Sequence, residues 1–256
     1  MMDFDMLLLL VPALITGILV LSTHVLFGRQ VLKRGIIFID LAIAQIAALG
    51  AIFARTQHDL TMLPFVQVWL PAVCAVVGAL LIAQLAKYFA DELEAMIGSL
   101  YVLAAVFGML ILAKDAHGAE LLKQLMSGQI LWVSWEQLLL PSIVYGVILL
   151  TLIMRPSLMH GRGFYLLFAL VITLSVELVG VYLVFSSLIL PALAVNKMMN
   201  LSAIWWAYGV GMMGYLLGLL LSMTFDLPSG AMIVVCLSMV TIAFRVLSAK
   251  KSLKNS

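Results

Sequence analysis

Residues 6–27 read MLLLLVPALITGILVLSTHVLF, a run without a single charged side chain. The hydrocarbon core of a bilayer is about 30 Å thick, and a helix crosses it with about 20 apolar residues. This stretch is therefore long enough and apolar enough to span a membrane. We expect it to remain a span and not a cleaved leader, because Asp3 and Asp5 precede it where a leader carries basic residues.

Further stretches of the same kind follow along the chain. They predict helices near 36–54, 64–89, 93–113, 137–154, 164–183, 201–223 and 230–248. Between the helices predicted at 164–183 and 201–223 lies SSLILPALAV (186–195), which is apolar, too short to cross and interrupted by Pro191. It resembles a half-helix or re-entrant segment. The prediction is an all-α, polytopic bundle of eight or nine helices.

The composition agrees with a membrane protein. Hydrophobic residues make up 65% of the 256 residues and charged residues 10%, whereas soluble domains have about 45–50% and 25%. A water-soluble enzyme is excluded. The net charge of +2 and the scattered basic residues offer no surface for nucleic acid. No linker or change of composition divides the chain, so we expect one transmembrane domain over residues 1–256.

The distribution of basic residues predicts the orientation, because loops rich in Lys and Arg stay in the cytoplasm. One assignment of sides places eleven of the fourteen Lys and Arg residues inside and three outside. The inner residues are Arg29, Lys33, Arg34, Lys87, Arg155, Arg162, Lys197, Arg245, Lys250, Lys251 and Lys254, and the outer ones are Arg55, Lys114 and Lys123. The N-terminus is then outside and the C-terminus inside, which requires an odd number of crossings and counts 186–195 as a short passage.

The longest polar connection spans residues 114–136 and faces the outside in this orientation. Its portion LLKQLMSGQILWVSW is too apolar for a solvated loop. We expect a surface helix there, anchored by Trp132 and Trp135 at the membrane interface.

Two acidic residues lie within predicted spans. Asp40 is placed one to two turns into the second helix among small residues and Gln45, and Glu177 is placed in the middle of the sixth. An acid within a membrane is costly and is a candidate functional residue whose partner must be sought. The alternative is that each is paired with a buried polar group such as Thr23, His24 or Gln84 and serves only assembly.

Other polar residues allow weaker hypotheses. Asp115, His117 and Glu120 supply two carboxylates and an imidazole within six residues, which suits zinc or manganese, although a solvated polar loop is the more frequent origin of such a cluster at a helix start. His24 is either a metal ligand or a hydrogen-bonded packing residue. The two cysteines and sixteen methionines show no metal-binding spacing, so we interpret them as apolar packing residues. No catalytic motif is found.

Four motifs carry a resemblance to a known family. They are GRQVLKRGIIFIDLAIAQIAALG (28–50), EAMIGSLYVLAA (94–105), VELVGVYLVFSSLILPALAV (176–195) and FDLPSGAMIVV (225–235). In this order the chain resembles the permease subunits of bacterial zinc and manganese importers of the ATP-binding-cassette class, the metal family of type II importers. The resemblance implies a multi-pass protein of the bacterial inner membrane.

The resemblance also implies partners. It implies a homodimer of this subunit, cytoplasmic ABC ATPase subunits that bind and hydrolyse ATP, and a periplasmic metal-binding protein. The transported ion is then zinc first and manganese second, no cofactor is covalently bound, and the chain has no active site of its own. A type II permease for a metal chelate or a vitamin-like organic ligand is the alternative, and a channel or an intramembrane enzyme is the rival from another class.

The chain departs from the family pattern at two places. The family usually has a His four residues after the second-helix Asp, whereas Ala44 follows Asp40 here, so Asp40 needs help from Gln45, Glu177 or another site. The cytoplasmic connection RPSLMHGRG (155–163) is shorter than the segment that usually docks the ATPase.

The resemblance and the residues together predict a set of functional positions. Asp40 is the predicted translocation ligand, Glu177 a pathway carboxylate, and the Asp115, His117 and Glu120 group an attraction site at the outer mouth. We expect Gln45, Gly180, Ser186, Ser187 and Pro191 to shape the pathway around a break in helix regularity. Arg155, His160 and Arg162 are the candidates for coupling to the ATPase.

Overall fold

The computed structural model describes residues 4–56, 64–113, 115, 118–128, 130–198 and 202–254. The described residues form helices and connecting turns, and none of them forms a strand. The α-helices are α1 (Phe4–Arg34), α2 (Ile39–Thr56), α4 (Pro64–Tyr88), α5 (Leu93–Leu112), α6 (Gly118–Ser127), α7 (Trp135–Met154), α8 (Gly163–Val179), α9 (Val181–Ala194), α10 (Ser202–Phe225) and α11 (Ser229–Lys254). The short 3-10 helices are η1 (Ala90–Glu92), η2 (Ile130–Trp132) and η3 (Pro156–Met159).

Seven of the described helices are long and apolar enough to cross a membrane, by length and composition. They are α1, α2, α4, α5, α7, α10 and α11, and the shorter apolar helices α8 and α9 lie among them. The predicted polytopic helical bundle is thus confirmed.

The predicted sixth helix is wrong at its C-terminal end. We expected 164–183, but α8 ends at Val179 and α9 begins at Val181. Gly180 between them has φ +79° and ψ 162°, a backbone conformation that essentially only glycine adopts. The short segment expected at 186–195 therefore begins earlier, because the helix breaks at the glycine and not at the serines.

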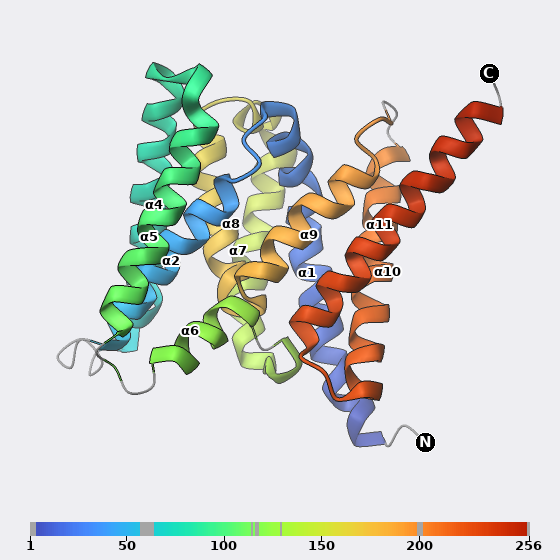
Figure 1. The fold of residues 1–256 in the computed structure, drawn as a ribbon, viewed down its shortest axis with the longest axis horizontal. Helices are drawn as coiled ribbons and strands as arrows, with labels where there is room; N and C mark the ends of the chain where they lie inside the picture. The colour runs from blue at the N-terminus through green and yellow to red at the C-terminus, as the bar shows by residue number, and fades with distance from the viewer. Residues whose placement is uncertain are drawn as a thin grey trace.

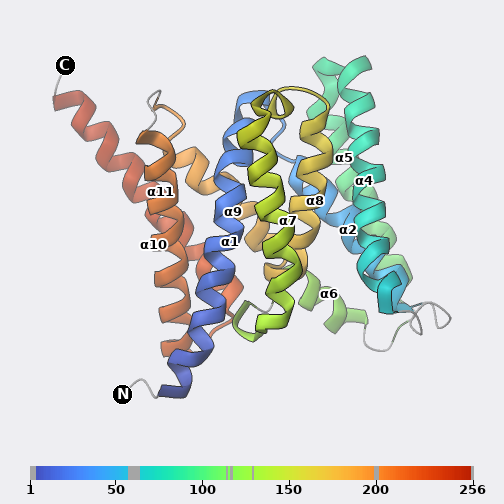
Figure 2. The same cartoon turned by 180° about the vertical axis from the view of Figure 1, so that it is seen from behind.

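The helices are arranged in two flanks around a central group (Figure 1). Helix α2 packs against α4 and α5 on one flank, and α10 packs against α11 on the other. Between them, α1 lies against α9, and α8 contacts α2 and α4. Figure 2 shows from behind that α7 covers this centre. Most of the membrane window of α2 is buried, whereas α4, α5, α7 and α11 expose most of theirs, as expected for helices that face lipid or another subunit.

The two chain ends lie at opposite ends of the bundle (Figure 1). The end that carries the C-terminus also carries the end of α1, the α4–α5 turn and the α7–α8 turn, to which most of the basic residues belong. We call this the basic end. The charge asymmetry predicted from the sequence is therefore present in the fold.

Arg34 fixes the α7–α8 turn to the end of α1. Its guanidinium lies 4.3 Å from the centre of the Phe164 ring and donates a hydrogen bond to the carbonyl of Met159 at 2.9 Å. Cation–π contacts of this kind contribute about 0.5–1 kcal/mol at exposed sites and more when desolvated. The short turn is thus held in place by a neighbouring helix.

A surface helix is confirmed within 114–136 as α6, which lies across the end opposite to the basic end (Figure 1). Its predicted extent over LLKQLMSGQILWVSW was wrong, because α6 ends at Ser127 before Gly128, which has a positive φ. Trp132 and Trp135 are exposed beyond it, as expected of interface anchors. Helix α7 then begins with a capping box, in which Ser134 Oγ accepts from the Gln137 N–H and Gln137 Oε1 accepts from the Ser134 N–H.

Candidate transport cavity

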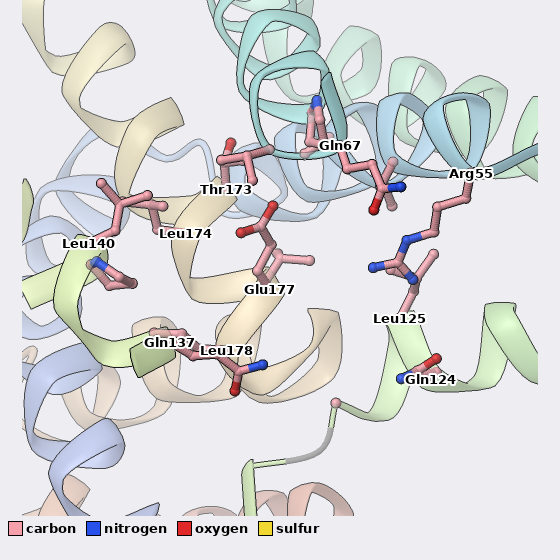
Figure 3. A pocket seen from close by; sticks show the side chains of 18 of the residues that line it. Arg55, Gln67, Gln124, Leu125, Gln137, Leu140, Thr173, Leu174, Glu177 and Leu178 are labelled. Carbon is pink, nitrogen blue, oxygen red and sulfur yellow. The ribbon is translucent and has the colours of Figure 1, made fainter. Parts of the chain in front are cut away.

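A cavity of about 460 Å³ opens between α2, α4, α6, α7 and α8 (Figure 3). It lies toward the end of the bundle that carries α6. Its polar lining residues are Arg55, Gln67, Gln124, Glu136, Gln137, Thr173 and Glu177. Apolar side chains and backbone complete the wall, so the cavity has few charged groups and mixed polarity.

One face of α2 forms a wall of small residues. Ala47, Ala48, Ala51 and Arg55 line the cavity and follow one another at helical spacing. The same face continues through Ala44 to Asp40 at the start of the helix, because residues four or seven apart lie on one side of a helix. A stripe of short side chains therefore leads from the cavity toward the basic end.

Glu177 projects into the cavity from the last turn of α8 (Figure 3). Its side chain is exposed to the open space, so it is not a carboxylate enclosed in the middle of a span as we expected. Thr173 lies one turn earlier on the same wall, and the Arg55 side chain on α2 extends into the same space and attracts the carboxylate. The cavity explains how an acid is accommodated within the bundle.

Asp40 lies outside the cavity, in the first turn of α2. It is 1% exposed, and neither carboxylate oxygen has a hydrogen-bond partner of ordinary geometry among the described residues. Its position one to two turns into the helix was wrong because α2 begins at Ile39. Seven residues separate it from Ala47, so it lies about 10 Å beyond the cavity along the helix axis.

The partners suggested for Asp40 are engaged elsewhere. Thr23 donates to the carbonyl of Val20, and Gln45 donates to the sulfur of Met126 at 3.3 Å. The charged group that acts on Asp40 is a second carboxylate, Glu94 of α5. Glu94 Oε1 accepts from the Phe38 N–H at 3.2 Å, and its Oε2 is buried without a partner among the described residues. Glu94 was not among the predicted functional residues, although it begins the motif EAMIGSLYVLAA (94–105).

The predicted outer-mouth group is not assembled at the cavity. Asp115 is exposed in the turn after α5, and Glu120 is exposed in the first turn of α6. Neither lines the cavity. His117 lies outside the described residues. Among the residues that the structure does describe, no three His, Cys, Asp or Glu side chains come together as a metal site.

Comparison with known proteins now adds independent evidence. The C-terminal part of the chain matches a model of a transport family. Residues 154–248 match the ABC 3 transport family. The matched segment includes the α8–α9 break and the last two spans. This C-terminal segment therefore resembles that transport family, in agreement with the resemblance to permeases of the ATP-binding-cassette class that the motifs predicted.

A solved structure described as PsaBC from Streptococcus pneumoniae in complex with Fab has the same fold as this permease. The TM-score is 0.73 at 22% sequence identity, over 92% of this chain and 90% of that chain. The similarity covers nearly the whole length, including the part that the family model leaves unmatched. No curated protein matches in the sequence comparison. Family and fold together confirm the predicted resemblance to this permease type, a multi-pass protein of the inner membrane.

The residues expected to shape the pathway of the permease have different surroundings. Gly180 forms the break itself. Ser186, Ser187 and Pro191 lie within α9, and their side chains do not line the cavity. Ser186 donates to the carbonyl of Tyr182 at 2.9 Å, so its hydroxyl is satisfied within the helix.

His24 is a hydrogen-bonded residue in the core of the permease. Its Nδ1 lies 2.8 Å from Ser187 Oγ on α9, and its Nε2 lies 2.9 Å from Ser175 Oγ on α8. Tyr145 of α7 joins the group, with its hydroxyl 2.5 Å from Ser175 Oγ. Because both ring nitrogens are engaged, the packing interpretation of His24 holds and the metal-ligand interpretation does not fit this arrangement.

The candidate coupling residues lie at the basic end of the permease. Arg155, His160 and Arg162 are exposed around η3, in the α7–α8 turn that Arg34 holds. Nothing in the surroundings of these side chains assigns them a partner.

Proposed function

We propose that this permease forms the membrane pathway of an ATP-driven importer for a divalent transition metal ion. The observation that supports it is the single face of α2 that connects two acidic regions. The cavity with Glu177 lies at one end of that face, and the buried Asp40 lies at the other, near the half-buried Glu94. A buried carboxylate such as Asp40 is costly, and a bound cation would offset that cost.

The orientation follows from the charge distribution. With the basic end in the cytoplasm, the cavity opens toward the outside and Asp40 lies near the inner end of the pathway. A cation delivered by an outer binding protein would first meet Glu177 and then pass along the alanine face. We propose that the functional unit contains two copies of this chain and cytoplasmic ATPase subunits that bind ATP, with Arg155, His160 and Arg162 at the contact.

The available donors bear on which metal is carried. Imidazole suits zinc, whereas carboxylate oxygens suit manganese. Ala44 stands where an imidazole would help Asp40, and Glu94 supplies oxygen instead. Manganese is therefore supported at least as well as zinc, which the resemblance alone placed first.

A second candidate is an organic ligand such as a metal chelate. The cavity volume favours it, because about 460 Å³ falls in the range of about 300–1,000 Å³ that is typical of small-molecule sites. This reading requires no intramembrane carboxylate, so full transport by an Asp40→Asn variant would support it.

The test is elemental analysis of cells that lack their other high-affinity metal importers. The partner subunits are expressed with no permease, the intact chain, Asp40→Asn, or Asp226→Asn as control. Asp226 is an exposed acid in the turn before α11, so the same chemical change there leaves the pathway intact. We expect zinc or manganese to rise with the intact chain and Asp226→Asn, and to fall about tenfold with Asp40→Asn. No rise with the intact chain would refute the proposal.

A further inference from the structure

The break at Gly180 leaves α8 and α9 without a continuous helical hydrogen-bond ladder. Helix α8 ends where the Gly180 N–H donates to Val176 O, and α9 starts where the Val184 N–H donates to Gly180 O. The relative position of the two helices must then be held by other contacts. Among the residues that the structure describes, His24 forms side-chain hydrogen bonds to both of them.

We propose that His24 is a positioning residue for transport, which joins α8 to α9 across the break and thereby holds Glu177 in the cavity. Ser175 and Glu177 are two residues apart on α8, and two residues correspond to about 200° around a helix. The histidine therefore anchors one side of α8 while Glu177 projects from the other. This inference rests on the proposed transport function.

The proton requirements make the anchor sensitive to its chemistry. Ser175 Oγ lies 2.7 Å from Val171 O, and Ser187 Oγ lies 2.7 Å from Leu183 O, so each hydroxyl can donate to its own helix. A neutral imidazole donates through one nitrogen and accepts through the other. The ring therefore hydrogen-bonds to both serines only if one serine donates its O–H to the unprotonated ring nitrogen. One of the two helices α8 and α9 is thus held by a hydrogen bond from the ring N–H, and the other by a hydrogen bond from a serine O–H to the ring.

The surroundings make replacement of this contact difficult. His24, Ser175 and Ser187 are all 0% exposed, so water does not reach their polar atoms. Buried polar groups that lose their partners are destabilised, and the group relaxes toward another arrangement. Loss of the ring should therefore move α8 relative to α9 and displace Glu177, with a direct effect on the apparent affinity for the transported ion.

The first test compares His24→Leu, His24→Gln and Thr23→Val in the metal-uptake assay, with the amount of permease in the membrane measured for each. Leu removes both hydrogen bonds, and Gln keeps one donor group and one acceptor group. Thr23 is the adjacent buried control, whose hydroxyl bonds only within α1. We expect His24→Leu to raise KM for the metal about tenfold with a smaller change in maximal uptake. His24→Gln should recover much of the loss, and Thr23→Val should match the intact chain.

A double variant that combines His24→Leu with Glu177→Gln distinguishes a role of His24 in positioning Glu177 from a merely structural role. If His24 acts through Glu177, the double variant transports no worse than Glu177→Gln alone. Additive losses, an unchanged KM in His24→Leu, or equal losses in His24→Leu and Thr23→Val would overturn the proposal. If His24→Leu fails to accumulate, Ser175→Ala and Ser187→Ala replace it. An unchanged KM in both serine variants would likewise overturn it.

A second readout does not depend on the metal. Leu174 lines the cavity on α8 and is half-buried. In a chain without Cys74 and Cys236, a Leu174→Cys variant is labelled from outside with a membrane-impermeant thiol reagent. We expect His24→Leu to change the labelling rate severalfold and His24→Gln to restore it. An unchanged labelling rate in His24→Leu would contradict the inference about His24, whether or not the intact chain transports metal. A failure of the intact chain to transport metal would by itself contradict only the proposed function.

Discussion

Gly180→Ala should destabilise this permease although it adds only one methyl group. A Cβ at Gly180 would lie 2.7 Å from Gly128 Cα and 2.8 Å from the Ser127 carbonyl carbon, and closer still to the Gly128 nitrogen. Real Cβ atoms essentially never come within 3.0 Å of such atoms. The backbone must therefore move by a few tenths of an ångström or more. The φ of +79° adds strain of about 1–3 kcal/mol for any residue with a Cβ.

The strain and the backbone clash together predict that Gly180→Ala lowers the free energy of unfolding by at least about 2–3 kcal/mol. For a chain of this size, each kcal/mol corresponds to about 2–4 °C in the unfolding midpoint. We expect Gly180→Ala to lower the midpoint of the purified permease by about 5 °C or more, measured by tryptophan fluorescence in detergent. Gly98→Ala is the control, because a Cβ there meets nothing within 4 Å and Ala favours the helix. Equal midpoints for the two variants would refute the reasoning about the Gly180–Gly128 contact.

Three further predictions concern charged residues. Glu177→Gln should raise KM for metal uptake, because the cavity then loses its carboxylate opposite Arg55; an unchanged KM would argue against a pathway role. Arg55→Ala should lower the same KM, because removing a positive charge from the cavity reduces repulsion of a cation, and a higher KM would indicate that Arg55 instead orders Glu177. Arg34→Lys should loosen the α7–α8 turn, because lysine cannot keep both the contact over Phe164 and the hydrogen bond to the Met159 carbonyl. We expect lower ATPase activity of the assembled transporter with unchanged metal binding, and unaltered activity would show that this turn does not couple transport to ATP hydrolysis.

Much of the fold could be predicted from local sequence. Long apolar runs favour membrane helices, because lipid offers the backbone no hydrogen-bond partners and a helix satisfies its own backbone within one segment. The asymmetry of Lys and Arg also needs no tertiary information. The amphipathic character of 118–127 and the Ser134–Gln137 cap are local patterns. Helix α7 formed close to its predicted position, whereas α6 overlaps only the first part of the predicted surface helix.

The predicted helix boundaries were wrong where local sequence patterns carry no information about the boundary. On both sides of Gly180 the residues of LVGVYLVF (178–185) are apolar, so only the backbone conformation of Gly180 reveals that the helix ends there. The glycine is required because the Ser127–Gly128 backbone contacts it from a distant part of the chain. Single-sequence patterns carry no information about that contact.

The sequence by itself determined that this protein is a helical membrane bundle, which end carries the positive charge, and that Asp40 and Glu177 are acids within apolar helices. Only the tertiary structure decided what surrounds those acids. It placed Glu177 in an open cavity opposite Arg55, and Asp40 beside Glu94. It also joined His24 to Ser175 and Ser187, which lie 151 and 163 residues further along the chain. Helix formation depends on residues within a turn or two, whereas a site depends on which helix faces pack together, and that is a property of the whole chain.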